Sequence, residues 1–333
     1  MKKLLFFFII ISFSIKSGSS QFIYPLSEYS ATDDEIEISK FDIKDTLLFL
    51  PLGNKSLQIL NIADLHNITE VSKFEEYEIR YNKKAYGKAY DVKVVGNKAF
   101  LAYGELGLKI IDITDPTMTY SIGTYYRHHD VNCVEIYENY ALLGFVDLGL
   151  EIVDYSNLDD ILMVSRNNIL GFTIENIQII PPYIIISGGS RGLYTFKFLE
   201  PFTNFKSTEF PRGFVNENEF NKLIVRGTVG YLANDFRGLS VLNIKLPLYP
   251  LEVLNIKTKG KAVDLAIDRN YLYVLSSKAI EVYDIKDPEK PEKIFEYAEK
   301  DKKYNNILIK DSNLFVSYTL SSEEYGIQVF QIE

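Results

Sequence analysis

A short segment of alternating apolar residues recurs seven times along the chain, and most copies end in Asp or Asn. Each copy follows a Gly or another small residue, and successive copies begin 41 to 51 residues apart. Strand-like repeats with a period in the forties are typical of β-propellers, in which each repeat forms one blade. We therefore expect an all-β, seven-bladed propeller. The copies begin at Leu57, Leu108, Leu150, Leu193, Leu239, Ile280 and Ile327.

Each unit contains four short runs rich in Val, Ile, Tyr and Phe, separated by Gly, Asn, Asp and Pro. In the second unit these runs are residues 91–95, 99–103, 108–113 and 120–125. Such runs indicate strands and turns, and no segment has a helical period. We predict four-stranded antiparallel blades. The turn after the third strand often carries a structural proline, as at Pro116, Pro201, Pro247 and Pro288.

The two ends of the chain indicate how the ring closes. The seventh unit has only three predicted strands, at 306–310, 313–318 and 327–332, whereas residues 24–29 have the character of a fourth strand. Residues 35–41 would then form the first strand of the first blade. If the N-terminal strand completes the last blade, backbone hydrogen bonds between the two ends close the ring and leave only short outer edges.

The first twenty residues have the pattern of a secretory signal peptide. Lys2 and Lys3 precede an apolar run over residues 4–13, and small residues at 17–20 provide a cleavage site before Gln21. No later apolar stretch is long enough to span a bilayer, and no cysteine stands directly after the cleavage point, which argues against a lipid-anchored lipoprotein. We expect residues 21–333 to form a single propeller domain that is exported: periplasmic, at the cell surface or secreted.

Charge and cysteine content narrow the possible partners. Loss of Lys2, Lys3 and Lys16 with the leader lowers the formal charge from -9 to -12. A chain this acidic, without a Lys/Arg block, is a poor candidate for binding nucleic acid. Cys133 is the only cysteine, so no intrachain disulfide can form, and we expect it to be a small buried side chain within a strand. No pattern indicates a cofactor.

The segments 107–112, 149–154 and 279–284 resemble the LVIVD repeat of bacterial and archaeal exported proteins. The preceding Ala-Phe/Tyr-Leu-Ala type strand and the following Asp-Pro turn also fit. The resemblance implies a seven-bladed propeller in the envelope or at the cell surface, and it offers no catalytic residues. Asn61, Lys197 and Gln331, for example, stand where Asp is usual, which argues against chemistry at this position. The chain has no Trp, which excludes the WD40 and quinoprotein signatures.

The loops that join second to third strands should lie on one face, together with the loops that lead into the next blade. Function on a rigid scaffold usually lies in such loops. Arg191 and Arg237 occupy matching Arg-Gly-Leu positions in neighbouring units and should lie close together. Their guanidinium groups could bind a carboxylate, a phosphate or an acidic partner loop; alternatively, each pairs with a neighbouring carboxylate such as Asp235 or Asp147. Further candidates on this face include Glu105, Lys278, Glu323 and Glu324.

Histidines and acidic pairs give weaker signals. His128 and His129 fall on the same predicted face, but adjacent side chains on an extended segment point in opposite directions, so this pair alone makes no metal site. The acidic segments 33–35 and 216–219 lack the ligand order of a calcium loop. His66 should lie on the opposite face, and no Gly-x-Ser-x-Gly elbow is present. We predict no metal and no catalytic residue.

Two functions remain open. We expect a non-enzymatic interaction module that binds a protein or an envelope polymer through the loop-lined face, as a transient binder or as a permanent part of a surface complex. The alternative is a carbohydrate-active hydrolase or lyase with its site at the channel mouth. That enzyme would require polar side chains from several blades to converge on the axis, with at least one shifted pKa. An axis filled by aliphatic side chains would argue against it.

Overall fold

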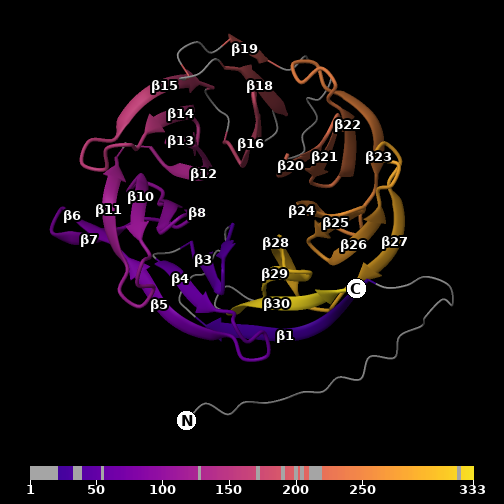
Figure 1. Ribbon diagram of the computed structural model, residues 1–333, viewed down its shortest axis with the longest axis horizontal. Helices are drawn as coiled ribbons and strands as arrows, with labels where there is room; N and C mark the ends of the chain where they lie inside the picture. The colour runs from indigo at the N-terminus through magenta and orange to yellow at the C-terminus, as the bar shows by residue number, and fades with distance from the viewer. Residues whose placement is uncertain are drawn as a thin grey trace.

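The computed structural model shows seven four-stranded antiparallel sheets arranged as a ring (Figure 1). It describes residues 22–32, 40–53, 56–126, 129–169, 173–188, 192–198, 202, 206–209, 220–320 and 324–333. The predicted leader lies outside these ranges. Within the described ranges, no helix has the length and apolar character needed to cross a membrane. The all-β, seven-bladed prediction is confirmed.

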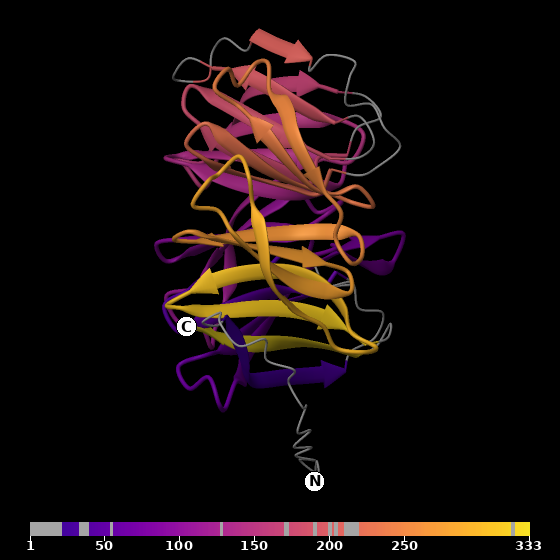
Figure 2. The same ribbon diagram turned by 90° about the vertical axis from the view of Figure 1, so that its right-hand side faces the viewer.

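Each blade runs from an inner first strand at the axis to an outer fourth strand at the rim (Figures 1 and 2). Strand lengths are three to ten residues, as expected for short propeller strands. Blade 1 comprises β2 (Asp42–Lys44), β3 (Leu47–Pro51), β4 (Ser56–Asn61) and β5 (Thr69–Glu75); blade 2 β8 (Asp91–Val95), β9 (Lys98–Ala102), β10 (Leu108–Asp112) and β11 (Tyr120–Tyr125); blade 3 β12 (Val131–Tyr137), β13 (Tyr140–Phe145), β14 (Gly149–Asp154) and β15 (Leu162–Asn168); blade 4 β16 (Asn176–Ile180), β17 (Tyr183–Ser187), β18 (Leu193–Lys197) and β19 (Lys206–Glu209).

The remaining three blades follow the same order, and the last one uses both ends of the chain. The predicted strands of units two and seven agree with those observed to within a few residues. Blade 5 comprises β20 (Lys222–Arg226), β21 (Val229–Asn234), β22 (Gly238–Asn243) and β23 (Leu251–Ile256); blade 6 β24 (Ala262–Asp268), β25 (Tyr271–Ser276), β26 (Ala279–Asp284) and β27 (Glu292–Tyr297); blade 7 β28 (Lys303–Lys310), β29 (Asn313–Thr319), β30 (Glu324–Ile332) and β1 (Ile23–Thr32).

The repeated motif is the third strand of each blade, and it is buried on both faces because neighbouring blades pack against each side. One core cluster, for example, joins Ile59 of blade 1 to Val92 and Leu101 of blade 2. This sandwiching explains why consecutive motif residues are apolar rather than strictly alternating. The hydrophobic core is therefore distributed between the blades, and no blade can bury its own faces alone.

The small residue before the motif and the polar residue at its end both serve turns. Gly107 has a φ of 78°, and a Cβ there would lie 2.1 Å from the Tyr125 carbonyl oxygen, so no other residue fits. At the other end, Asp112 Oδ1 accepts a hydrogen bond of 2.8 Å from the Thr114 amide. Asn61 Oδ1 makes the same bond to the Ala63 amide at 2.9 Å, which explains why Asn replaces Asp. The motif Asp is structural.

Ring closure occurs as predicted. Strand β1 pairs antiparallel with β30 along its length, with Tyr24 opposite Gln331 and Tyr29 opposite Ile327 (Figure 1). The first strand of blade 1 was placed too early: the structure has it at Asp42–Lys44, and most of the predicted segment 35–41 lies outside the described residues.

Buried polar side chains also join blade 7 to blade 1. Gln58, on the third strand of blade 1, is fully buried. Its Oε1 accepts a hydrogen bond of 3.0 Å from the Tyr325 hydroxyl, and its Nε2 donates to the Tyr29 hydroxyl at 3.1 Å. Both tyrosines belong to blade 7. Closure therefore rests on side-chain bonds between blades as well as on the β1–β30 ladder.

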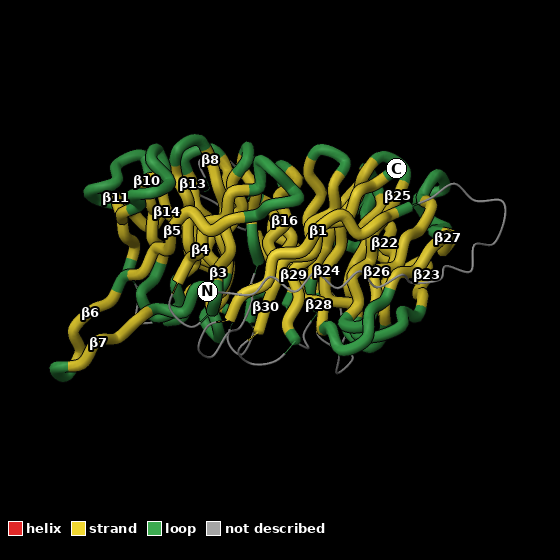
Figure 3. Tube along the Cα trace, turned by 90° about the horizontal axis from the view of Figure 1, so that it is seen from below, coloured by secondary structure: helices red, strands yellow, loops and turns green. Residues whose placement is uncertain are grey.

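A hairpin that the sequence analysis did not predict is inserted between blades 1 and 2. Strands β6 (Tyr77–Arg80) and β7 (Lys83–Tyr86) form a separate two-stranded sheet. Tyr81 and Asn82, with φ values of 50° and 60°, make its turn. Figure 3 shows the hairpin extending beyond one end of the disc.

We expect Tyr325→Phe to lower the free energy of unfolding by about 1–3 kcal/mol, because it leaves the buried Gln58 Oε1 without its donor. Urea denaturation measures the change. Tyr249→Phe is the control, because Tyr249 is 62% exposed and should be neutral. Equal stability of Tyr325→Phe and the native protein would contradict a closing role for this bond.

Candidate functional site

One face of the disc is formed by the loops joining second to third strands and by the loops leading into the next blade; we call it the loop-lined face. The chain direction in every blade places both sets of loops at the same end of the strands. The β6–β7 hairpin extends from this end, whereas the C-terminus lies at the opposite one (Figure 3). The described candidates Glu105, Asp147, Asp235, Arg237 and His129 all lie in loops of this face.

Arg237 is engaged within its own blade. Its Nη2 contacts both carboxylate oxygens of Glu252, at 3.0 and 2.9 Å, and both side chains are three-quarters or more buried. The partner is neither Asp235 nor Asp147. Because its guanidinium group already pairs with the Glu252 carboxylate, Arg237 is poorly placed to bind an anionic ligand. Arg191 lies outside the described residues, so the predicted pairing of the two arginines stays a prediction.

The other described candidates also support the loops. Asp235 has a positive φ of 36°, and its Oδ1 lies 3.2 Å from Lys261 Nζ. Asp147 likewise occupies a tight turn, with a φ of 60°. Burial, followed by the charge of Glu105, raises the pKa of Asp130, whereas Lys88 and His129 oppose this shift. His128 and the acidic segments 33–35 and 216–219 lie outside the described residues.

Polar side chains from all seven blades converge on the axis. The mouth on the loop-lined face is a cavity of about 270 Å³. It leads to a smaller cavity of about 60 Å³. Lys40 reaches from blade 1 to donate to the Glu175 carbonyl oxygen at the start of blade 4. The residues that line one or both cavities include Lys40, Asp91, Asn176, Lys222, Asp264 and Asn306.

Most of these axial groups fasten one blade to the next. A side chain near the start of each first strand bonds the backbone of the following blade, at every junction from blade 1 to blade 7. An unmade bond at such a buried position would be costly, so these contacts contribute to holding the ring together. Four side-chain oxygens accept hydrogen bonds from backbone amides of the next blade: Asp42 Oδ2 (from Val94, 2.8 Å), Asp91 Oδ2 (from Val134, 3.1 Å), Asn176 Oδ1 (from Leu223, 3.2 Å) and Asp264 Oδ2 (from Ile307, 2.9 Å). Two side-chain amides donate to backbone carbonyl oxygens: Asn132 Nδ2 (to Ile174, 2.8 Å) and Asn221 Nδ2 (to Ala262, 2.7 Å).

Asp91 is a buried acid of the channel with a shifted pKa. Burial raises its pKa, although Lys40 and Lys93 lower it. Its Oδ1 is buried and has no hydrogen-bond partner among the described residues. Burial raises the pKa of Asp42 as well. The axis is therefore polar rather than aliphatic, and it contains acids of shifted pKa, as the enzymatic alternative requires.

Cys133 lies in β12 beside this channel, as predicted. Its side chain is 1% exposed, and burial raises the pKa of the thiol to about 12. It is therefore a small buried side chain and no nucleophile at neutral pH. Among the described residues, no group of three or more His, Cys, Asp or Glu side chains is arranged to hold a metal ion.

A groove of about 700 Å³ lies on the loop-lined face between blades 6 and 7, and the sequence analysis missed it. Its walls come from three segments that are separate in the sequence: the loop before β24, the turn after β25 and the loop before β28. No single segment has enough lysines to indicate an anion-binding site by itself. The alternating lysines of Lys257-Thr-Lys259-Gly-Lys261 are the sequence feature that could have indicated it. The groove is lined by Lys259, Lys261, Ser277, Lys278, Ala298, Glu299, Lys300, Asp301, Lys302 and Lys303.

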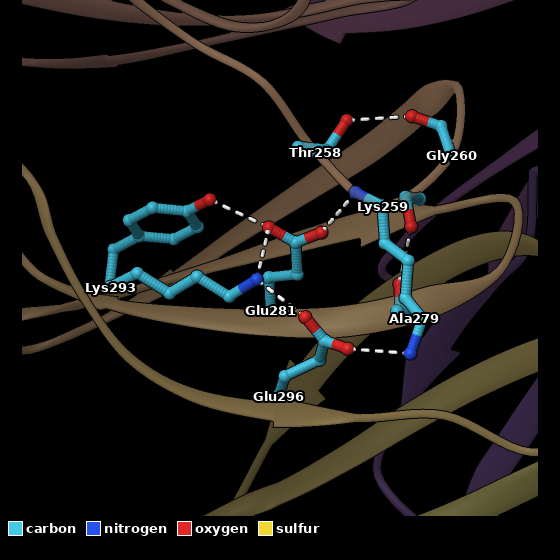
Figure 4. Close-up of polar contacts among 9 residues, drawn as sticks. Thr258, Lys259, Gly260, Ala279, Glu281, Lys293 and Glu296 are labelled. Atoms are coloured by element: carbon cyan, nitrogen blue, oxygen red, sulfur yellow. Dashed lines mark hydrogen bonds and ion pairs between the residues drawn. The ribbon is translucent and has the colours of Figure 1, made fainter.

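The blade 6 wall of this groove is anchored by a buried carboxylate (Figure 4). Glu281, fully buried on β26, accepts from the Lys259 amide at 2.6 Å and pairs with Lys293 at 3.2 Å. Glu296 bridges the two lysines, at 2.6 Å from each Nζ. Burial would raise the pKa of Glu296, but these two cations hold it below its usual value. The loop carrying Lys259 is therefore fixed in place.

The raised pKa of Asp91 predicts a pH dependence. Since the folded state holds this proton more tightly than the unfolded chain, stability falls as the pH rises from the ordinary value of 3.8 through the folded pKa. We expect Asp91→Asn, which cannot ionise, to gain stability relative to the native protein as the pH rises above 3.8. Urea denaturation at several pH values measures the difference.

Asp115→Asn is the matched control with the opposite sign. Hydrogen bonds from Thr117 lower the pKa of Asp115, so the stability of this variant relative to the native protein should fall as the pH rises towards 3.8 and stay constant above it. A stability difference for Asp91→Asn that does not change with pH would show that the buried carboxyl does not titrate as described.

Comparisons with known proteins agree with the architecture. The structure is similar to the WD40 β-propeller domain of Doa1, with a TM-score of 0.66 and 7% identity over 92% of this chain and 96% of that one. It is also similar to the computationally designed Ika8 protein, with a TM-score of 0.61 and 9% identity over 92% and 99% of the two chains. At these identities the likeness concerns the fold alone. No curated protein sequence matches the chain.

The sequence comparison identifies the repeat. The family model named LVIVD repeat matches residues 86–126, 130–168 and 259–299. These ranges coincide with blades 2, 3 and 6, whose motif segments carry the resemblance noted in the sequence. The other blades keep the same strand order and the same interblade packing. The chain therefore contains three LVIVD repeats within a seven-bladed β-propeller fold.

Proposed function

We propose that this protein is an exported, non-enzymatic interaction module that binds a protein or an envelope polymer through its loop-lined face. The observation that carries the proposal is the groove between blades 6 and 7, which at about 700 Å³ exceeds either axial cavity. Its size falls within the range of binding sites in proteins. The leader pattern of residues 1–20 supports export.

The state of the axial groups supports a binding role over a catalytic one. Asp264 accepts from the Leu265 and Ile307 amides at 2.8 and 2.9 Å, and its Oδ1 lies 3.5 Å from Lys222. These contacts commit the carboxylate to the junction between blades 6 and 7. The polar axis is thus accounted for by the assembly of the ring.

Site-specific photocrosslinking in the native cells tests the proposal. A photoreactive residue at position 278, exposed on the loop-lined face of blade 6, should form adducts with an envelope component. The control is position 245, exposed at the opposite end of the neighbouring blade 5, where we expect none. Identical adducts from both positions, or a protein that stays in the cytoplasmic fraction, would contradict the proposal.

The hydrolase or lyase alternative is favoured by one observation, the convergence of Glu175, Asp264 and Lys222 at the channel mouth. It predicts release of new sugar ends from envelope polysaccharides, abolished by Glu175→Gln. Our account predicts no release by the native protein, measured by a reducing-end assay together with absorbance for the unsaturated products of a lyase. Cleavage that depends on Glu175 would replace the binding role.

A further inference from the structure

The groove between blades 6 and 7 gathers positive charge on an acidic protein. Six lysines line it, against the two acids Glu299 and Asp301. The chain as a whole carries a formal charge of -9. A local reversal of sign in a concave site raises the local concentration of anions. The groove is therefore the place on this face where an anionic partner is best accommodated.

Three of the six lysines are used to build the groove. Lys259 pairs with Glu296 at 2.6 Å and Lys261 with Asp235 at 3.2 Å. Lys302 is 7% exposed and lies 3.0 Å from Glu28 and 2.8 Å from Glu299, with its Nζ 4.3 Å from the centre of the Tyr318 ring. These contacts join blades 5, 6 and 7, so the walls are held in position before any ligand arrives.

The other three lysines remain available. Lys278, Lys300 and Lys303 are exposed, and none of them makes an ion pair or a side-chain hydrogen bond within the described part of the chain. They come from the turn after β25 and from the loop before β28, so they face the groove from two sides. Three exposed cations without such partners, carried by two walls of the groove, favour a ligand that carries several negative charges.

The kind of lining residue selects among anionic ligands. The described residues that line the groove include no arginine, which is preferred for bidentate recognition of phosphate, and no aromatic residue for stacking a nucleobase or a sugar ring; the exposed Phe236 ring lies outside this lining, against Lys261. A long polyanion would also run over the acidic remainder of the surface and be repelled. A short run of Asp or Glu side chains on a peptide avoids both difficulties. Flexible carboxylates can pair with lysine ammonium groups without arginine or aromatic contacts, and a short segment does not extend over the acidic surface.

We infer that this groove binds a short acidic peptide segment of a partner protein, held by Lys278, Lys300 and Lys303. The inference rests on the proposed binding role of the loop-lined face and specifies its partner. Such binding is dominated by exposed ion pairs, so it weakens as salt screens the charges.

Fluorescence anisotropy with a labelled hexaglutamate peptide at low ionic strength tests the inference. We expect saturable binding that weakens with added salt. The triple variant Lys278→Gln, Lys300→Gln and Lys303→Gln should bind about tenfold more weakly, from the loss of three exposed ion pairs. The matched control changes Lys245, Lys286 and Lys290 to Gln at the opposite ends of blades 5 and 6, and should bind like the native protein.

Unchanged binding by the triple variant, or no binding of the peptide by the native protein, would overturn the inference. Tighter binding of an oligogalacturonate or of a single-stranded DNA oligonucleotide than of the peptide would also overturn it, in favour of those polymers. All three substituted lysines are exposed, and matching urea denaturation curves exclude misfolding. Adducts at position 278 that persist when Lys300→Gln and Lys303→Gln accompany the photoreactive residue would leave the proposed function standing while the acidic-peptide inference fails.

Discussion

Hydrogen bonds between neighbouring blades are the interaction on which the rest of this structure depends. Each blade buries its faces only against its neighbours, and at each of the six junctions from blade 1 to blade 7 a polar side chain near the axis bonds the next blade, from Asp42 and Val94 at the first to Asp264 and Ile307 at the sixth. The seventh junction is closed by β1 on β30 and by Tyr325 on Gln58. Opening one junction would break its hydrogen bonds and uncover the packed faces of both blades. Because this is costly, we expect the ring to unfold as one unit.

This constraint explains where polar residues occur and what they do. The motif Asp and Asn residues cap turns, the carboxylates and amides at the axis fasten first strands, and buried Glu281 anchors the loop at Lys259. Polar residues committed to the fold cannot at the same time serve a ligand well. By contrast, Lys278, Lys300 and Lys303 make no ion pair or side-chain hydrogen bond within the described part of the chain, and all three line the groove between blades 6 and 7. This difference is the reason for proposing the groove as a binding site.

Much of the fold could be predicted because each motif copy marks the third strand of a blade, and the short seventh unit indicated closure by β1. The site could not be predicted in the same way. Arg237 stood out in the sequence, but its partner Glu252 lies on the fourth strand of its own blade, and only the strand register brings the two together. The groove joins lysines from blades 6 and 7 that are about twenty residues apart, so no local pattern reveals it. The β6–β7 hairpin was missed because Tyr81-Asn82 lacks the Asn-Gly signal of a tight turn.

Native-state hydrogen exchange on β1 tests the central claim most directly. If β1 closes the ring, its amides opposite Ile327 and Gln331 should be protected to the same degree as those of the inner strands of blade 7, and they should exchange only when the whole ring unfolds. Rapid exchange of β1, while β28 and β29 remain protected, would show that the terminal strand is an independent attachment and would contradict a ring held together by its ends.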